Sequence, residues 1–407
     1  MLSPESTEIV KATAGVVAEN SVAITERFYP HMFAAHPELM RVFNKANQAI
    51  GEQPRALAAS VVAYAVHLID PDAPDFGPIM RRIAHKHVSL GIKSYEYPIV
   101  GHHLMWAIGD VLGDAVTPEI AAAWDEVYWL FGCQLIAEEG RLYALGETDP
   151  EHPWHKYRIV ERIDENPEVF SLLLAPVDGE APEHSTGQYV AIAVDLPNGE
   201  RQPRQYTISS GPRGDTLRVT IKRVRGLNGA PDGQVSNWLG DNAAPGMLLD
   251  VSQPCGDLVL DESDGPLVLV SAGIGITPIA AIVEDLSRRQ PDRQVRIFHA
   301  DLSHTSHALY DHLRRQVLSM GDAKAQNWYE EDAESAPTLH PALPGFMDLS
   351  DIEIPEDATV FMCGPLPFMQ ATRKALLGKG VRAERIRYEV FGPDLWANNP
   401  DSAETAG

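Results

Sequence analysis

The stretch Arg204-Gln205-Tyr206-Thr207 decides how this chain is organised. It follows a polar turn at residues 198–200, and in a strand Arg204 and Tyr206 share one face while Thr207 lies on the other. The arginine fork binds oxygens in pairs, as a pyrophosphate presents them, and a tyrosine ring can lie against a flat heterocycle. Alone, these four residues are more typical of an ordinary strand, so the flanking segments decide between the two interpretations.

Apolar and polar residues alternate on both sides of this stretch, which predicts short strands separated by turns. The expected strands are Lys156–Ile163, Val169–Leu174, Gln188–Val194, Arg204–Ser209, Leu217–Val224 and Met247–Val251. Together they predict a small antiparallel barrel. Within it, Gly233-Gln234-Val235-Ser236 begins a helix whose free backbone N–H groups suit a phosphate, although an ordinary N-cap has the same pattern.

Further along, the apolar strand Leu267–Ser271 precedes Gly273-Ile274-Gly275-Ile276-Thr277-Pro278, which opens a helix. The two glycines let the backbone approach a phosphate, and proline suits the first helical position, but the third glycine of the full dinucleotide fingerprint is missing. Strands and helices then alternate, which predicts a parallel α/β sheet. The expected elements are Val295–His299, Ser306–Met320, Thr359–Cys363, Phe368–Gly378 and Ile386–Val390.

Two of these strands end at residues that suit a ligand site. Cys363-Gly364-Pro365 ends one strand, where open α/β sheets bind ligands, although a buried cysteine is usually inert. Asp301 follows another strand, where an acid favours a ribose hydroxyl over a 2′-phosphate, or is only a turn residue. The residues therefore leave the choice between a free ribose hydroxyl and a 2′-phosphate open.

Residues 1–147 lack strand-like alternation and are rich in Ala, Leu and Glu, which predicts an all-α domain. The expected helices are Glu5–Phe33, Pro37–Val42, Arg55–Ile69, Ile79–Gly91, Tyr97–Leu112 and Pro118–Leu145. In the fourth of these, His85 and His87 lie roughly 200° apart, so only one can face the core. His87 is the inward one, because it shares a face with Ile83 and Leu90. A lone inward histidine is more often a hydrogen-bonded core residue than a ligand.

Other side chains of the helical domain suit a pocket opposite His87. An aromatic hydroxyl, a ring, an amide and a branched apolar group are supplied by Tyr29, Phe43, Gln53 and Leu57. Pro30 follows Tyr29 inside a presumed helix, which it should disturb, whereas Pro54 suits an early helical turn.

The chain length, net charge, apolar runs and cysteine content argue against several classes of protein. A chain of 407 residues suggests two or three domains, and its net charge of −24 argues against nucleic acid or an anionic membrane as a partner. No apolar run is long enough to cross a bilayer, and the N-terminus lacks a signal-peptide pattern. Cys133, Cys255 and Cys363 form neither a disulfide framework nor a zinc site, so a reducing cytoplasm is expected.

In their order along the chain, Phe28-Tyr29, Phe43, Asn47-Gln48, Lys86-His87 and residues 97–101 resemble the haem pocket of a globin, specifically the haem domain of the flavohaemoglobins. The resemblance implies haem b with His87 as the proximal iron ligand, Tyr29 and Gln53 on the distal side, and Phe43 and Leu57 lining the haem. It also implies that Tyr97 and Glu139 hydrogen-bond around His87. Glu138 competes with Glu139, but Glu139 lies four residues before Tyr143 as in the family, and Glu138 suits a solvated helix face.

Gly187-Gln188-Tyr189 and the two segments beginning at Arg204 and Gly233 resemble the FAD domain of the ferredoxin-reductase-like superfamily. The residues implied to contact FAD are Tyr189, Arg204, Gln205, Tyr206, Thr207, Gly233, Gln234, Val235 and Ser236, the last of them facing the pyrophosphate. The residues implied to hold NAD(P)H are Gly273, Ile274, Gly275, Ile276, Thr277, Pro278, Cys363, Gly364 and Pro365, with Cys363 in a supporting role beside the nicotinamide.

The end of the last strand is implied to lie near the flavin. The residues concerned are Val390, Phe391, Gly392 and Pro393, while Glu389 is implied to face Lys86 across the gap between flavin and haem. The sequence departs from the family at Val390, where cysteine is common, and at Ile276, where glutamine is common. Neither change removes a charge.

The resemblance covers nearly the whole chain and predicts three domains: an all-α globin over 1–147, an antiparallel FAD barrel over 153–262, and a parallel-sheet NAD(P) domain over 263–407. It implies nitric oxide dioxygenase activity, in which electrons pass from NAD(P)H through FAD to haem and nitric oxide and dioxygen become nitrate. The alternatives are an NAD(P)H-dependent reductase of peroxides, ferric iron or quinones, and an oxygen-binding or sensing haemoprotein. The expected protein is a cytoplasmic monomer whose partners are the small molecules O2 and NO.

Overall fold

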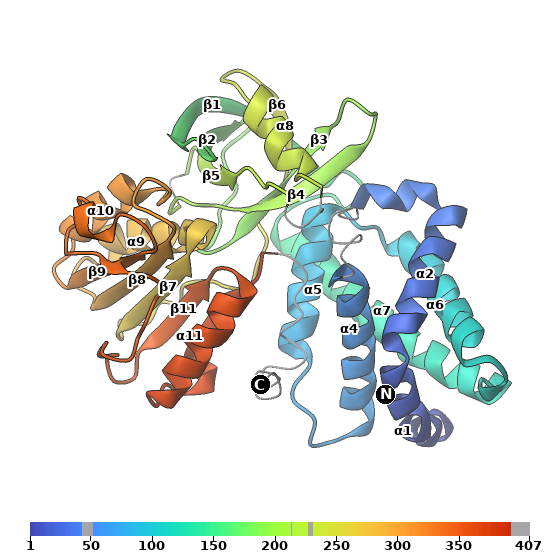
Figure 1. Cartoon of the computed structure of the whole chain (residues 1–407). Coiled ribbons are helices and arrows are strands. Elements are labelled where there is room, and N and C mark those ends of the chain that lie inside the picture. Colours follow the sequence, from blue (N-terminus) through green and yellow to red (C-terminus); the bar gives the residue numbers. More distant parts are fainter. Residues whose placement is uncertain (43–51, 213, 227–230, 392–407) are drawn as a thin grey trace.

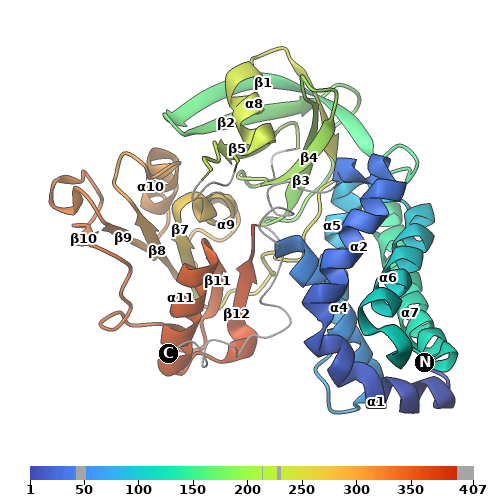
Figure 2. The same cartoon turned by 45° about the vertical axis from the view of Figure 1, so that its right-hand side comes forward.

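The computed structural model describes residues 1–42, 52–212, 214–226 and 231–391, although the side chains of residues 52–56 and 58 lie outside the description. Three parts of the chain form three lobes, with a helical lobe at the right of Figure 1, a barrel at the top and a parallel sheet at the left. Figure 2 shows the same arrangement from another side. The fold class expected from the sequence is therefore confirmed.

The helical lobe begins with two helices where the sequence predicts one. Its elements are α1 (Pro4–Glu19), α2 (Ser21–Ala35), η1 (Pro37–Val42), α4 (Glu52–Ile69), α5 (Gly77–Leu90), η2 (Ser94–Glu96), α6 (Tyr97–Leu112), η3 (Gly113–Ala115) and α7 (Pro118–Leu145). The helix expected over Glu5–Phe33 is wrong, because the Asn20 side chain donates to the Val16 carbonyl at 2.8 Å and α1 ends there. Pro30 does not break α2, which continues through it. Pro54 lies in the first turn of α4, where its missing N–H has no partner to lose.

The barrel consists of β1 (Trp154–Asn166), β2 (Val169–Pro176), β3 (Tyr189–Asp195), β4 (Arg201–Thr207), β5 (Leu217–Lys222) and β6 (Leu248–Ser252), with α8 (Gln234–Asn242) packed against it. The strand order is β4-β3-β6-β1-β2-β5, and all the pairs are antiparallel. An antiparallel bridge between Ile208 and Val219 joins the two outer strands, so the sheet closes on itself around a core of aliphatic side chains.

The third lobe is a parallel sheet in the order β10-β9-β8-β7-β11-β12. Its elements are β7 (Leu267–Ala272), η4 (Gly273–Gly275), α9 (Ile276–Arg289), β8 (Val295–Asp301), α10 (Tyr310–Leu318), β9 (Ala323–Tyr329), η5 (Ala333–Ser335), β10 (Leu343–Pro344), β11 (Thr359–Cys363), α11 (Leu366–Gly378), η6 (Ala383–Arg385) and β12 (Ile386–Glu389). The apolar side chains of α9 and α10 cover one face and those of α11 the other, which buries both faces of the central strands.

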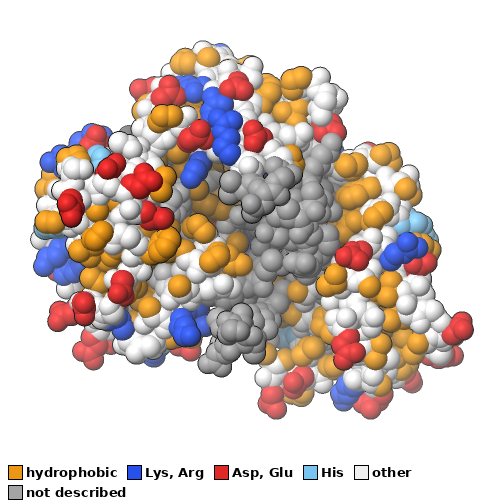
Figure 3. All heavy atoms as spheres, viewed as in Figure 1, with side chains coloured by type: hydrophobic (Ala, Val, Ile, Leu, Met, Phe, Trp, Pro, Cys, Tyr) orange, Lys and Arg blue, Asp and Glu red, His pale blue; other side chains and the backbone are white. Residues whose placement is uncertain are grey.

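The lobe boundaries lie close to the domain limits proposed from the sequence. Helix α7 ends at Leu145, β1 begins at Trp154 and β7 begins at Leu267. Acidic side chains occur on all three lobes of the face in Figure 3, in keeping with the strongly negative net charge. Among the helices of the described residues, none combines the length and apolar content that a membrane span requires.

Candidate functional site

The central feature of the helical lobe is the side chain of His87, on the last turn of α5. That helix ends at Gly91, whose positive φ of 70° allows its N–H and that of Ile92 to satisfy the last carbonyls. The Nδ1 atom of His87 lies 2.8 Å from Oε1 of Glu139 and 2.9 Å from the hydroxyl of Tyr97. Within the described residues its Nε2 has no hydrogen-bond partner, so this nitrogen is the one available to a ligand.

The two partners of His87 come from different helices. Tyr97 begins α6 and Glu139 lies in the buried face of α7, and the tyrosine hydroxyl also donates directly to the Glu139 carboxylate. Burial, followed by the nearby charge of Glu139, raises the pKa of Tyr97, so its hydroxyl stays protonated and remains a donor. Glu138 instead pairs with Arg141 at the surface, and that ion pair lowers the pKa of Glu138. The structure therefore brings His87, Tyr97 and Glu139 together and leaves Glu138 out.

The residues expected on the other side of the pocket are described only in part. Tyr29 is buried in α2 with its ring 4.7 Å from that of Phe28, and burial raises the pKa of its hydroxyl. Leu57 packs against the same core. Phe43 and the side chain of Gln53 lie outside the described residues.

The outer face of α5 contacts the other two lobes through Arg82, His85 and Ser89, and we call this contact the seam. Nδ1 of His85 accepts the Gly256 N–H at 3.0 Å, and the Ser89 hydroxyl accepts from the Gln205 amide at 2.7 Å. The third seam residue, Arg82, contacts the loop after β6 and the last strand of the parallel sheet. Its guanidinium lies 3.6 Å from the Asp257 carboxylate and 5.0 Å from the centre of the Tyr388 ring. Sequence reasoning placed His85 away from the core but missed this seam, although residues 82, 85 and 89 share the i, i+3, i+7 spacing of one helix face.

The stretch that opened the sequence analysis forms most of β4. Arg204 and Tyr206 lie on one face, while Thr207 is buried on the other. The Arg204 guanidinium donates to the Pro203 carbonyl at 2.6 Å and to Gln202 at 3.0 Å. Gln205, which was expected to contact a flavin, turns its amide towards the helical lobe. Opposite Thr207 on β3, Tyr189 is buried in the apolar core of that lobe.

The start of α8 is held against the segment that follows β5. The Ser236 hydroxyl accepts the Val224 N–H at 3.1 Å and donates to the Gly233 carbonyl at 3.3 Å. The Gly233 N–H donates to the Val224 carbonyl at 3.0 Å, and a Cβ at Gly233 would lie 2.7 Å from the Val224 Cβ. Of the four residues expected to face a phosphate, Gln234, Val235 and Ser236 lie in the first turn of α8, where main-chain N–H groups suit that ligand.

The segments expected to hold a dinucleotide meet at one edge of the parallel sheet. Gly273 has a positive φ of 54°, and a Cβ on Gly275 would lie 2.2 Å from the Cys363 carbonyl oxygen. In the sheet register Cys363 lies beside Ser271 on one side and Glu389 on the other. Burial raises the pKa of the Cys363 thiol, so it is not a reactive thiolate.

The remaining expected residues have varied positions around this edge. Ile274, Ile276 and Thr277 belong to the turn and the first residues of α9, and Pro278 is the third residue of that helix rather than its first. Gly364 packs against Phe368, Pro365 caps α11, and Val390 packs on the core beneath β12, while Phe391 is half exposed. Gly392 and Pro393 lie outside the described residues.

Asp301 ends β8, and its carboxylate is occupied within the chain. It accepts from the Ser306 hydroxyl at 2.6 Å and from the Leu302 N–H at 2.7 Å, and His299 lies 3.4 Å away. Burial by itself would raise the pKa of Asp301, but hydrogen bonds and the nearby His299 outweigh it and lower that pKa. Asp301 thus has the contacts of a turn residue, and the choice between NADH and NADPH stays a matter for experiment.

Two histidine rings in close contact lie beside Asp301, and one of them is fully enclosed. The His299 and His307 rings are 3.9 Å apart, Nδ1 of His307 is bonded to the Tyr329 hydroxyl at 2.9 Å, and Nε2 of His307 has no partner within the described residues. Burial, followed by the nearby His299 and His304, lowers the pKa of His307 well below its usual value.

We expect the stability of this lobe to fall in acid. The unfolded chain takes up a proton at the usual pKa of about 6.5 and the folded chain does not, so stability present above that pH is lost below it by about 1.4 kcal/mol per pH unit. The check is urea unfolding at pH 7, 6 and 5. His307→Gln should flatten this dependence, whereas His152→Gln, which changes an exposed histidine, should leave it unchanged. An equally steep fall in His307→Gln would contradict the assignment.

Comparisons with known proteins agree with this arrangement. The globin family model matches residues 26–134, and the oxidoreductase NAD-binding domain model matches residues 269–374. A flavohemoprotein of Bordetella parapertussis is 41% identical over 402 residues, which cover 96% of this chain and 99% of that relative. The flavohemoprotein of Chromobacterium violaceum is 40% identical over 401 residues, covering 96% of this chain and 98% of that relative.

Solved structures match in the same way. The crystal structure of a flavohemoglobin from Malassezia yamatoensis, with bound FAD and heme, is 34% identical and has a TM-score of 0.85 over 96% of this chain and 100% of that one. The FAD/NAD-binding domain of a nitric oxide dioxygenase from Vibrio cholerae is 33% identical with a TM-score of 0.54, and it covers 59% of this chain and 99% of that one. The chain therefore belongs to the flavohemoprotein family.

Proposed function

We propose that this flavohemoprotein is an NAD(P)H-dependent nitric oxide dioxygenase, which converts nitric oxide and dioxygen to nitrate. The observation that carries the proposal is that α5 has two functional faces. One face presents His87, which is hydrogen-bonded to Glu139, and the other face contacts both reductase lobes. The Vibrio cholerae relative that matches those two lobes is described as a nitric oxide dioxygenase, which supports the same reaction. A cytoplasmic monomer that acts on the small molecules O2 and NO is part of this proposal.

The residues present fit a haem b group. Nδ1 of His87 is held by Glu139 and Tyr97, which leaves Nε2 for the iron and makes the imidazole a stronger donor. No group of three or more His, Cys, Asp or Glu residues in the described chain is arranged for a metal ion, whereas haem iron needs only one protein ligand. Haem, FAD and NAD(P)H supply the redox chemistry when bound, and the protein supplies position and tuning.

Some of the proposed site residues within the described chain have surroundings that support a role. The Tyr29 hydroxyl stays protonated because burial raises its pKa, so it can donate a hydrogen bond to a gas molecule in the pocket. The backbone turn at Gly273 and Gly275 would receive the dinucleotide phosphates. Lys86 follows the seam residue His85 on α5, and Glu389 is buried at the end of β12, so we place both beside the path between flavin and haem.

The test is consumption of nitric oxide by purified protein loaded with haem and FAD. We expect NAD(P)H and dioxygen to be required and nitrate to form in proportion to the nitric oxide consumed. The same preparation is compared with peroxide, ferric iron and quinone as acceptors. Faster turnover with one of these acceptors, together with slow nitric oxide consumption, would contradict the proposal in favour of a general reductase.

The relay around His87 gives a sharper prediction. Replacing Glu139 by glutamine keeps a hydrogen-bond acceptor but removes the charge that strengthens the imidazole, so we expect nitric oxide turnover or haem affinity to fall about 10- to 100-fold. Glu138→Gln is the matched control, because Glu138 pairs with the surface residue Arg141 and not with His87, and its activity should be unchanged. The measurement is nitric oxide consumption with haem content. Equal activity in both variants would show that Glu139 does not tune the site.

A further inference from the structure

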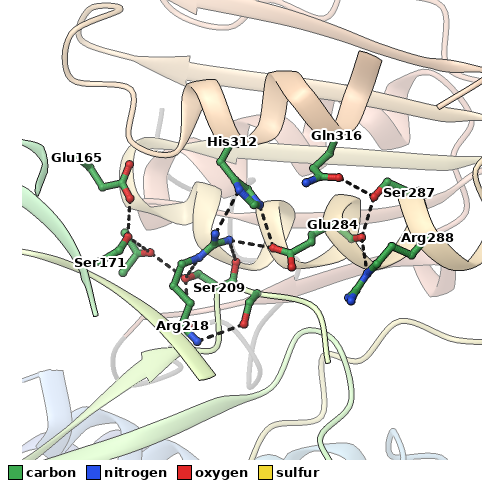
Figure 4. Close-up of polar contacts among 11 residues, drawn as sticks. Glu165, Ser171, Ser209, Arg218, Glu284, Ser287, Arg288, His312 and Gln316 are labelled. Atoms are coloured by element: carbon green, nitrogen blue, oxygen red, sulfur yellow. Dashed lines mark hydrogen bonds and ion pairs between the residues drawn. The ribbon is translucent and has the colours of Figure 1, made fainter. Parts of the chain in front are cut away.

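A buried cluster of charged and polar side chains joins the barrel to the parallel-sheet lobe. The Arg218 guanidinium, from β5, lies 3.3 Å from the Glu284 carboxylate of α9 and 3.3 Å from Nδ1 of His312 on α10. Nε2 of His312 lies 2.9 Å from the same oxygen of Glu284. Figure 4 shows the three side chains converging from these elements. The Glu284 side chain is 1% exposed, and those of Arg218 and His312 are 11% and 14% exposed.

The donors and acceptors of the cluster settle how its hydrogens are arranged. Arginine only donates, so Nδ1 of His312 accepts from Arg218 and Nε2 carries the proton that is donated to Glu284. Each side chain of the cluster therefore has a hydrogen-bond partner within it, and the donor and acceptor roles are fixed.

The second half of α9 is fastened to the barrel at neighbouring points as well. The buried Asp285 carboxylate accepts from the Thr186 hydroxyl at 2.7 Å. Gly211 lies so close to α9 that a Cβ there would be 3.2 Å from the Cα of Asp285 and 2.5 Å from the Arg288 guanidinium. The contact between helix and barrel is thus close enough to define an orientation.

Both ends of the cluster lead directly to the segments assigned to cofactors. Arg218 donates to the carbonyl and the hydroxyl of Ser209, which lies two residues after Thr207 of the flavin stretch. Glu284 lies on the helix that begins immediately after Gly275 of the dinucleotide turn. The cluster therefore links the flavin strand to the nucleotide helix over a short path.

A buried ion pair is weak evidence for stability, because desolvation of the charges offsets most of their attraction. Its geometry is nevertheless demanding, which suits a role in setting the relative position of two lobes. We propose that Arg218, Glu284 and His312 are positioning residues that hold α9 at a fixed angle to β4 and so set the approach of the nicotinamide to the flavin. This inference rests on the proposed function, because it assumes hydride transfer between those two groups.

The experiment is anaerobic stopped-flow reduction of the flavin by NADH and by NADH deuterated at the transferred position. In Glu284→Gln we expect the rate constant at saturating NADH to fall about 10- to 100-fold, because small errors of position are costly for an oriented transfer. The deuterium isotope effect should rise and the KM for NADH should change little. The matched control is Glu262→Gln, which removes an exposed partner of Arg289 on the same helix and should leave the rate constant unchanged.

A role in stability alone predicts a different result. A variant that is only less stable gives a smaller amplitude of flavin reduction with the native rate constant. The double variant Arg218→Met, Glu284→Met removes both charges and keeps apolar bulk, so it should fold while hydride transfer stays slow. A native rate constant in either variant would overturn the proposal.

A measurement that does not depend on turnover completes the test. Hydrogen exchange of the Glu284→Gln protein should quicken in residues 281–289 and 208–212 and stay native in the strands of the parallel sheet. Unchanged exchange in those two segments would count against the proposal. Failure of the proposed function is distinguishable, because the native protein itself would then lack NADH-dependent nitric oxide consumption. Failure of the inference leaves the native protein active and the variants equal to it.

Discussion

Replacing His87 by alanine should abolish haem binding and with it the consumption of nitric oxide. The imidazole is the proposed iron ligand, so the loss should exceed the roughly 10- to 100-fold that follows from changes in groups that only hydrogen-bond a ligand. The purified variant should lack a Soret band that shifts with carbon monoxide. It should still contain flavin and still pass electrons from NADH to a diffusible acceptor, because most of the buried side chains of the barrel and of the parallel sheet pack in clusters outside the helical lobe.

The matched control for this variant is His102→Ala, which removes an exposed histidine from the same lobe. That protein should keep the native haem content, spectrum and activity. A His87→Ala protein that consumed nitric oxide at the native rate would exclude His87 as the iron ligand and remove the basis of the proposed function.

The second large effect is expected from Gly275→Ala. The added Cβ would lie 2.2 Å from the Cys363 carbonyl oxygen and 2.5 Å from its carbon, and both are backbone atoms that cannot rotate away. We expect a loss of about 3 kcal/mol or more in the stability of the parallel-sheet lobe, at the upper end of the range for overpacking. NADH affinity should fall at least tenfold, which corresponds to about 1.4 kcal/mol, because the turn must move away from β11.

Gly378→Ala provides the control, since its Cβ would meet no atom of the described residues within 4 Å outside its own helix backbone and chain neighbours, and its φ is not positive. That change should leave NADH binding native and stability equal or slightly higher. The measurements are urea unfolding and titration of NADH against flavin fluorescence. Native NADH affinity in Gly275→Ala would show that the turn does not need the close approach.

The periodicity of the sequence was sufficient to predict most of the fold, because the buried faces of helices and strands leave regular apolar patterns. The prediction failed at a helix end that one polar side chain sets, and at a strand that depends on a distant neighbour. Asn20 ends α1 through a side-chain bond to Val16, and β9 begins Ala323-Lys324-Ala325-Gln326, which alternates but contains no large apolar or β-branched side chain. That strand forms because β8 offers it a neighbour, and a neighbour distant in sequence is invisible to a local pattern.

In the candidate site, too, some features could be predicted from the sequence and others depend on contacts between distant residues. Helical geometry alone placed His87 inward, and family resemblance chose Glu139 over Glu138. The cluster around Arg218 joins residues far apart in the sequence, so no local pattern indicates it. The seam on α5 leaves one local pattern, the spacing of residues 82, 85 and 89, but the partners of these residues lie far away in the sequence. The assignment of Gln205 to a flavin stays a prediction, and the structure adds a contact that the sequence did not indicate, between its amide and Ser89 across the seam.

Tyr189 and Cys255 belong to the barrel by chain order, yet they are counted among the buried side chains of the helical lobe's core. An excised fragment that ended after α7 would lose these two side chains and expose the apolar surface they cover, so it should be prone to aggregate. Exchange of the helical lobe between related proteins would therefore need to carry the matching barrel loop with it. The same contact predicts that substitutions on α5 and on the barrel surface facing it change together during evolution.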